Sequence, residues 1–415
     1  VQCSSFENME KKFLLEKLEH LQHLTLSWNL EGDKKGEKDH LPLLESLKPH
    51  SKLGSLILVG FQGPSLPVWF TSLESLDKLS LQDCHEFKYL SKQDDQLPNL
   101  KILELVKLKH LKYITQECNK EASFYKSLEE MTIKDCPMLK SLWENETEEN
   151  ETVLQSCTLE LQRLNTMSIP LKNLLIQDCS DLTNLSGVFQ HLSSLQCLTI
   201  ENCHTISLEG ESKAWESLKS LRFLTLKGFS KLSSLSFGEG VTTLEELTLE
   251  NCLKLTSISD IGTLNSMQKL TLRSCGWLTS ISDIGTLTSL QELTLENCPK
   301  LTSISDIGTL TSMQKLTLRS CGGLTSISDI GTLTSLQELT LENCPKLTSI
   351  SDSKGQDTSL RSLEISKCNK LKSLPKTIFK SLQTLRILNC DSLQPMFVKD
   401  TGDYFPLICH IKDLQ

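Results

Sequence analysis

Five cysteines in the second half of the chain, from Cys252 to Cys344, follow one another at a constant spacing of 23 residues. Each stands in the same frame, Leu/Met-x-x-Leu-x-Leu-x-x-Cys-x-x-Leu-x-x-Ile. A fixed period of this length indicates a solenoid, in which every unit buries its apolar edge against the next unit. A solenoid grows by adding coils, so the 415 residues do not imply two or three compact domains.

Each part of the frame has a structural role. Leu293-Thr294-Leu295 alternates apolar and polar residues, which predicts a short strand with its leucines inward. A 23-residue unit has no room for a hairpin partner, so its strand must pair with the strands of neighbouring coils. Cys298 then enters the core, and Asp306 or its neighbour Ser305 suits the cap of a short helical turn before the tight return at Gly308. The predicted fold class is therefore α/β: a curved, horseshoe-like solenoid of about 15 coils, with a parallel concave sheet and short helical or irregular convex segments.

The regular array also alternates in charge from coil to coil. Residues 267–306 and 313–352 differ only at Trp277 and Gly323, which indicates duplication. Because adjacent strands lie about 4.8 Å apart, we predict two ladders of alternating sign across the concave face. Their members are Glu246, Lys269, Glu292, Lys315 and Glu338, and Glu250, Arg273, Glu296, Arg319 and Glu342. Such a surface largely neutralises itself and is a poor docking patch for a partner of one charge.

Departures from the frame divide the chain into three predicted parts. Residues 1–20 form an N-terminal lead-in or cap, residues 21–394 the solenoid, and residues 395–415 a C-terminal cap over the last open edge. Within the solenoid we expect an acidic insertion loop at about 143–167 and the near-identical array at 244–350.

Composition excludes several classes of function. The net charge of −9 argues against nucleic acid or an anionic membrane as the main partner, and no apolar run reaches the roughly 18 residues of a membrane span. Sixteen cysteines are present, and a cysteine with one periodic role is a buried structural thiol. Free thiols indicate a reducing compartment. Eleven cysteines occupy the ladder position: Cys84, Cys136, Cys179, Cys203, Cys252, Cys275, Cys298, Cys321, Cys344, Cys368 and Cys390.

Catalytic and metal-binding patterns are not found in the sequence. No Ser/His/Asp or zinc spacing occurs, so we expect no enzymatic activity, no metal site and no cofactor in this chain. A column of four aspartates recurs with the coils; solvated caps explain it more simply than a calcium site does. Trp277 could be an exposed hot spot, but packing against the neighbouring coil is the preferred interpretation, and Trp69 is expected beneath its coil.

Partner contact is expected on the concave face where the outward strand positions are irregular. Leu175 is the most informative of these positions, because an apolar side chain that points outward needs cover. Simple solvation is the alternative for each residue alone. The candidates are Ser80, Glu104, Thr132, Leu175, Thr199, Thr225, Glu364, Ser366, Thr384 and Arg386.

Three stretches resemble the leucine-rich-repeat domain of plant intracellular nucleotide-binding immune receptors of the coiled-coil type. They are residues 24–29 followed by a charged loop, residues 44–53, and Gly60-Phe61-Gln62-Gly63 followed by Leu66-Pro67-Val68-Trp69-Phe70. Cys-Pro-x-Leu at Cys136, Cys298 and Cys344 is also similar to that family. The resemblance covers nearly the whole chain.

The resemblance implies a cytoplasmic disease-resistance receptor, possible also in the nucleus or at a membrane surface. Its repeat domain would sense a pathogen effector, or a host protein that an effector has modified, and hold the nucleotide switch off. Late coils, with Glu364, Ser366, Thr384 and Arg386, would meet the ligand, and early coils the nucleotide-binding domain. No Gly-x-x-x-x-Gly-Lys-Ser/Thr occurs here, so ATP or ADP is expected only on that other domain.

Two further interpretations stay open at this point. The same solenoid could be the substrate-recruiting adaptor of a ubiquitin ligase. An extracellular receptor or inhibitor is disfavoured by the ladder of free thiols.

Overall fold

The computed structural model describes residues 2–3, 15–28, 40–91, 99–115, 126–142, 169–183, 185–208, 215–352, 358–411 and 413–414. The chain divides into two compact units, Val1–Ser207 and Leu208–Gln415. The predicted insertion at about 143–167 lies outside the described residues, as does most of the charged loop after the first coil.

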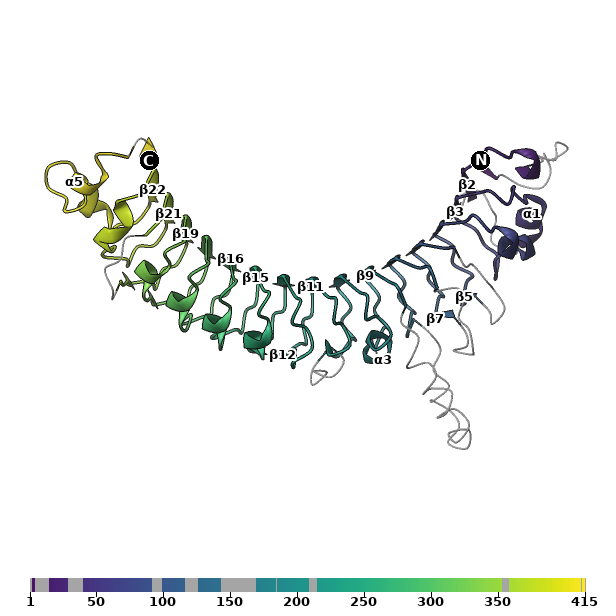
Figure 1. Ribbon diagram of the computed structural model, residues 1–415, viewed down its shortest axis with the longest axis horizontal. Helices are drawn as coiled ribbons and strands as arrows, with labels where there is room; N and C mark the ends of the chain where they lie inside the picture. Colours follow the sequence, from purple (N-terminus) through teal and green to yellow (C-terminus); the bar gives the residue numbers. More distant parts are fainter. Residues whose placement is uncertain are drawn as a thin grey trace, which may run out of the picture. The chain divides into compact units, whose positions relative to one another are not determined.

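The first unit is built on one parallel sheet in which each strand pairs with the strand of the next coil (Figure 1). Short helical segments and a second pairing, β5 (Tyr89–Ser91) with β7 (Tyr113–Thr115), lie away from that sheet. The sheet strands are β1 (Gln2–Cys3), β2 (His23–Trp28), β3 (Ser55–Val59), β4 (Lys78–Gln82), β6 (Ile102–Val106), β8 (Glu130–Lys134), β9 (Asn173–Gln177) and β10 (Cys197–Glu201). The helical segments are η2 (Leu15–Lys17), α1 (Leu41–Ser46), η3 (Val68–Ser72) and α3 (Ser186–Phe189).

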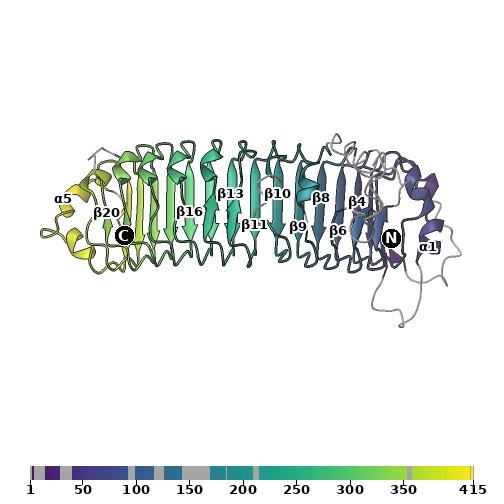
Figure 2. The same ribbon diagram turned by 90° about the horizontal axis from the view of Figure 1, so that it is seen from below.

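The second unit repeats the arrangement more regularly. Figure 2 shows its strands side by side, with short helical turns along one edge and the turns that follow the strands along the other edge. The sheet strands are β11 (Phe223–Lys227), β13 (Glu246–Glu250), β15 (Lys269–Arg273), β16 (Glu292–Glu296), β17 (Lys315–Arg319), β19 (Glu338–Glu342), β21 (Ser362–Ser366), β22 (Thr384–Leu388) and β23 (Asp413–Leu414). Outer-wall strands are β12 (Ser234–Ser236) with β14 (Ser257–Ser259), and β18 (Ser326–Ile327) with β20 (Ser349–Ile350). The helical segments are η6 (Ile261–Thr263), η7 (Ile284–Thr286), η8 (Ile307–Thr309), η9 (Ile330–Thr332), η10 (Lys376–Phe379), η11 (Gln394–Phe397) and α5 (Phe405–Ile408).

The inward leucines form the core, as the alternating pattern predicts. Leu293 and Leu295 of β16 are fully buried, and the same holds for Leu270 and Leu272 one coil earlier. Each buried leucine contributes about 1.5–3 kcal/mol relative to exposure. Because the register pairs each leucine with the leucine 23 residues on, the core is continuous from coil to coil. The prediction of a parallel-sheet solenoid with few helices is confirmed.

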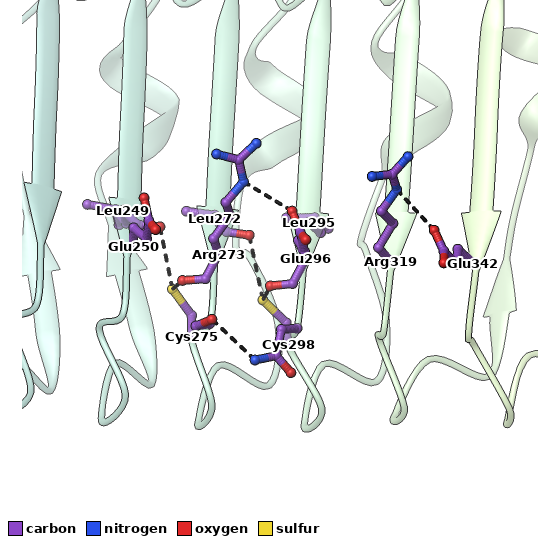
Figure 3. Close-up of polar contacts among 12 residues, drawn as sticks. Leu249, Glu250, Leu272, Arg273, Cys275, Leu295, Glu296, Cys298, Arg319 and Glu342 are labelled. Atoms are coloured by element: carbon purple, nitrogen blue, oxygen red, sulfur yellow. Dashed lines mark hydrogen bonds and ion pairs between the residues drawn. The ribbon is translucent and has the colours of Figure 1, made fainter.

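The ladder thiols are buried and unpaired, again as predicted. The Cys298 thiol donates to the carbonyl oxygen of Leu272 in the preceding coil, at 3.8 Å, and to that of Glu296 in its own strand, at 3.5 Å (Figure 3). Where the frame replaces the cysteine, Leu108 and Phe229 fill the same buried place. At the end of each such strand, the buried cysteine therefore makes a weak hydrogen bond to the backbone and exposes no polar atom.

A residue in the left-handed region precedes nearly every ladder position, a feature the sequence analysis missed. Asn297, with φ 53°, directs its N–H to the carbonyl oxygen of Arg319 in the next coil, at 2.8 Å. The recurrence of Asn, Asp or Gly at this place was the available signal, since these residues tolerate positive φ. The full set is Gly60, Asp83, Lys107, Asp135, Asp178, Asn202, Gly228, Asn251, Ser274, Asn297, Ser320, Asn343, Lys367 and Asn389.

Two predictions about the outer turn are wrong: Asp306 does not cap the helical turn with its side chain, and Gly308 is not there to form a tight return. Asp306 precedes the 3-10 turn η8, but it has φ 52° and its side chain makes no cap hydrogen bond. Instead, the Thr309 hydroxyl contacts the carbonyl oxygens of Asp306, at 2.8 Å, and of Gly285, at 2.6 Å. Gly308 is required by close packing: a Cβ there would lie 2.6 Å from Thr332 Oγ1 of the following coil.

Aromatic residues close the packing near both ends of the chain. Trp69 is buried, as predicted, and its indole N–H donates to the carbonyl oxygen of Leu44 at 3.0 Å. In the second unit the buried Tyr404 hydroxyl donates to the Leu374 carbonyl, at 2.9 Å, and accepts from its N–H, at 2.8 Å. Strand β23 then pairs with β22 in the predicted C-terminal cap, residues 395–415.

Two thiols of the ladder, Cys252 and Cys321, predict a loss of stability at alkaline pH. Burial raises the pKa of Cys252 to about 11 and that of Cys321 to about 12, above the ordinary 9.0. Below pH 9 these thiols are protonated in both the folded and the unfolded chain. Above pH 9 the thiols ionise first in the unfolded chain. Each buried thiol therefore lowers the free energy of unfolding by about 1–3 kcal/mol by pH 11–12. Urea unfolding measured from pH 8 to pH 11 should show this decline.

A matched pair of variants isolates the cause of the alkaline decline. Cys321→Ala should flatten the dependence of the unfolding free energy on pH, whereas Cys409→Ala, at an exposed thiol, should leave its slope unchanged. Equal slopes in both variants would show that the buried thiols do not contribute.

Candidate functional site

Each strand of the sheet presents three outward side chains, which form three rows along the face. In the second unit the middle row is a run of threonines whose register is set by the strand pairing. Thr271 and Thr317 are buried, whereas Thr248 and Thr294 are half-buried. The middle row is therefore uniform and uncharged from Thr225 through the array.

The two outer rows form the predicted charge ladders. Lys269 lies opposite Glu246 and Glu292, and its ammonium is 3.3 Å from Glu292 Oε2. In the other row Arg273 Nε is 3.1 Å from Glu296 Oε2, and Arg319 Nε is 3.3 Å from Glu342 Oε2 (Figure 3).

In the array each ion pair joins a cation to the carboxylate of the following coil. Lys315 Nζ completes the set at 2.8 Å from Glu338 Oε2, and this hydrogen bond raises the lysine pKa. All these side chains are well exposed, so each pair contributes about 0–1 kcal/mol. In the array every lysine and arginine of the sheet face is therefore paired with a carboxylate of the chain.

The last coils of the second unit break this regularity. Glu364 and Arg386 lie opposite each other on β21 and β22, with Arg386 Nη1 3.5 Å from Glu364 Oε1. Thr384 and Ser366, the other candidates here, are half-buried in the rows beside them. Leu388 lies opposite Ser366 and is 44% exposed, an apolar member of this surface that sequence analysis missed. Its outward position on the last full strand was the available signal.

In the first unit the candidates fall on the middle row. Leu175 is half-buried and lies between Thr132 and Thr199 on the neighbouring strands. Glu104 is held by Lys78, whose ammonium is 2.7 Å from Glu104 Oε1.

The prediction that Ser80 is a contact residue is wrong, because the residue is buried. It occupies the outward position, but its side chain is fully covered, and the Gln82 amide donates to its hydroxyl at 3.2 Å. A long neighbouring side chain folded over it therefore removes Ser80 from the accessible face.

Trp277 and the aspartate column lie away from the sheet face. Trp277 contacts the next coil through Lys300, whose ammonium lies 3.6 Å from the centre of its ring, yet 54% of Trp277 stays exposed. Within the described residues, no cluster of three or more His, Cys, Asp or Glu side chains is disposed to hold a metal ion.

None of the helices in the described part of the chain has the length and apolar character that crossing a membrane requires.

Comparison with known proteins finds plant disease resistance proteins at both ends of the chain. Residues 2–108 match the family described as R13L1/DRL21 leucine-rich repeats, and residues 206–345 and 263–391 match the leucine-rich repeats of RPS2-like plant disease resistance proteins.

Two relatives from Solanum bulbocastanum agree with these matches, and one solved structure shares the fold. Disease resistance protein RGA2 is 29% identical over 45% of this chain, and RGA1 is 30% identical over 52%. The matched regions span 20% and 22% of those proteins, so the similarity covers about a fifth of their length. A leucine-rich-repeat protein of Leptospira interrogans has the same fold, with a TM-score of 0.50, 21% identity, and coverage of 98% of this chain and 99% of that one.

The ladder geometry predicts the outcome of a charge reversal. Lys315→Glu places a carboxylate opposite both Glu292 and Glu338, and like charges directly opposite destabilise a sheet. We expect a loss of about 1 kcal/mol in urea unfolding, smaller at high salt. Adding Glu338→Lys should recover part of that loss. If the double variant were as unstable as the sum of the single ones, the rows would not be electrostatically coupled.

Proposed function

Because this chain is a leucine-rich-repeat region of the plant disease resistance protein family, we propose that it recognises other proteins and catalyses no reaction itself. The proposed ligand is a pathogen effector or a host protein that an effector has modified. A second partner is the nucleotide-binding domain of the same receptor, which the repeats hold in its inactive state. ATP or ADP would bind that domain, with no cofactor on these repeats, and the receptor would act in the cytoplasm.

The contrast along the sheet face of the second unit carries this proposal. In the array, cations and carboxylates of adjacent coils neutralise each other over a uniform threonine row. At β21 and β22 the rows contain Ser366, Thr384 and the exposed Leu388 around the Glu364–Arg386 pair. Apolar and charged groups placed together, with a rim of hydroxyls, are the usual composition of a protein interface.

Leu175 supports a second contact, in the first unit. Its half-buried side chain stands in a row otherwise occupied by the hydroxyls of Thr132 and Thr199. An apolar group at this place gains from cover by a partner. We assign this contact to the nucleotide-binding domain, since early coils are expected to lie near it.

A charge swap tests recognition by the last coils. Glu364→Arg combined with Arg386→Glu keeps an ion pair across β21 and β22, so the unfolding temperature should change little. A specific partner would instead meet reversed charges, and its affinity for the full receptor should fall at least about tenfold in a binding titration. The matched control is Lys315→Glu with Glu338→Lys, which makes the same swap inside the array.

Comparison of the two swaps shows whether the partner binds at β21 and β22 or at the regular array. Loss of affinity in the last-coil swap alone supports the proposal. Unchanged affinity in that swap, or an equal loss in the control swap, would move the recognition site elsewhere.

Leu175→Thr tests the contact in the first unit. The substitution makes the middle row uniform, and because the side chain is only half-buried, stability should change by less than about 1 kcal/mol. We expect weaker binding of the nucleotide-binding domain, measured by calorimetry with the two parts as separate chains, and higher basal signalling in the full receptor. Undiminished binding of that domain would exclude Leu175 from the contact.

A further inference from the structure

The turn after the last full strand of the second unit, β22, contains Asp391, but the turns after the seven sheet strands before it, β11 to β21, carry only one sign of charge. We call these six-residue segments the turn edge; they run from one residue before each ladder position to four residues after it, between 228 and 372. Across seven coils the turn edge contains no aspartate or glutamate, although the chain as a whole has a net charge of −9. Its charged residues are Lys231, Lys254, Lys300, Lys346, Lys367, Lys370 and Lys372.

These lysines are exposed and available. Five of them, from Lys231 to Lys370, occupy the same place in five of the seven coils, two residues after the ladder position. None of the seven forms an ion pair with any residue in the described part of the chain. This distinguishes them from the cations of the sheet face, which carboxylates of adjacent coils neutralise.

The compensating acidic row lies at the other edge of the unit. Asp260, Asp283, Asp306 and Asp329 precede the helical turns η6 to η9, at the edge opposite the post-strand turns (Figure 2). Lys254 and Asp260 stand six positions apart along extended chain, a span of up to about 20 Å, about twice the screening length at physiological salt. The aspartate row therefore does not neutralise the basic edge.

Trp277 adds an apolar centre to this basic edge. It occupies the lysine position in its own coil, with 54% of its surface exposed, and Lys300 of the next coil lies over its ring at 3.6 Å. Leu253, 51% exposed, belongs to the turn just before it. Tryptophan is one of the residues most enriched among those that dominate the binding energy of protein interfaces.

The fold does not require tryptophan or lysine at this position. The duplicated coil has Gly323 there, and a Cβ at Gly323 would lie 2.6 Å from the carbonyl oxygen of Leu301. The two coils, otherwise matching over forty residues, thus accommodate opposite extremes of size at one place. Trp277 is not part of the buried core, and the turn forms without a tryptophan in the duplicated coil. Its exposed face is therefore accessible to a partner.

We propose that the turn edge of the second unit is a docking surface for an acidic protein segment, with Trp277 receiving an apolar side chain of that segment. This surface is distinct from the sheet face of the proposed recognition function. Charge complementarity favours an acidic partner, and the exposed tryptophan and leucine favour a protein over a polyphosphate.

Fluorescence anisotropy with a labelled peptide of repeated Glu-Glu-Leu-Ser units tests this proposal on the whole chain. The combined variant Lys254→Glu, Lys300→Glu and Lys346→Glu should weaken binding at least about tenfold. Trp277→Gly, which copies the duplicated coil, should weaken it about five- to tenfold. The same peptide with serine in place of leucine should bind the natural chain more weakly but be insensitive to Trp277→Gly.

A matched control places the same charge change on post-strand turns of the first unit, with Lys88→Glu, Lys112→Glu and Lys140→Glu. This control should leave affinity within about threefold of the natural chain. The thermal unfolding temperature of each variant verifies that it folds. Replacing Lys254, Lys300 and Lys346 with glutamine removes their charge without reversing it. An equal loss in the control would overturn the proposal, as would tighter binding of a single-stranded oligonucleotide of the same charge to the same edge.

Discussion

Each described coil contributes one strand to the main sheet, and a strand on its own leaves its backbone N–H and C=O groups unsatisfied. The coil must therefore pair with its two neighbours, and a unit of constant length pairs only in register. Leu293 meets Leu270 and Leu316, and Thr294 meets Thr271 and Thr317. Once this pairing is set, the continuous leucine core, the thiol ladder and the rows of the outer face all follow, because any feature of one coil becomes the neighbour of the same feature in the next.

Register also decides where charge can be presented. Identical charges in every coil would repel on the sheet face, and the array avoids this by alternating Glu coils with Lys and Arg coils. The face is left nearly neutral, so recognition falls to irregular coils such as those with Leu175 or with Glu364 and Arg386. The turn edge follows a different pattern: its lysines recur every second coil in the array, with Trp277 and Gly323 between them. The wider spacing of those lysines lets like charges share one edge.

Periodicity made the larger part of the fold predictable. The strands, the buried thiols, the places of Leu108 and Phe229 and both charge ladders follow from residue type and spacing alone. Spacing did not reveal local backbone geometry: the left-handed residue before each ladder position, the positive φ of Asp306 and the close approach at Gly308 depend on torsion angles and inter-coil distances. Nor did it reveal what long side chains cover, so Ser80 was expected on the surface although Gln82 folds over it, and Leu388 was overlooked. Candidate contacts remain harder to predict than the scaffold, because they depend on the exceptions to its pattern.

Deleting coils tests most directly whether register alone makes neighbours of matching residues. Removal of residues 267–312 takes out one full charge period and brings Lys315 beside Glu246, whereas removal of residues 290–312 takes out a single coil and brings Lys315 beside Lys269. Both chains should fold, and thermal unfolding should be measured in each from low to high salt. The account predicts that salt raises the unfolding temperature more in the single-coil deletion, because screening relieves its like-charge contacts. An identical response to salt in the two deletions, or failure of the two-coil deletion to fold, would contradict it.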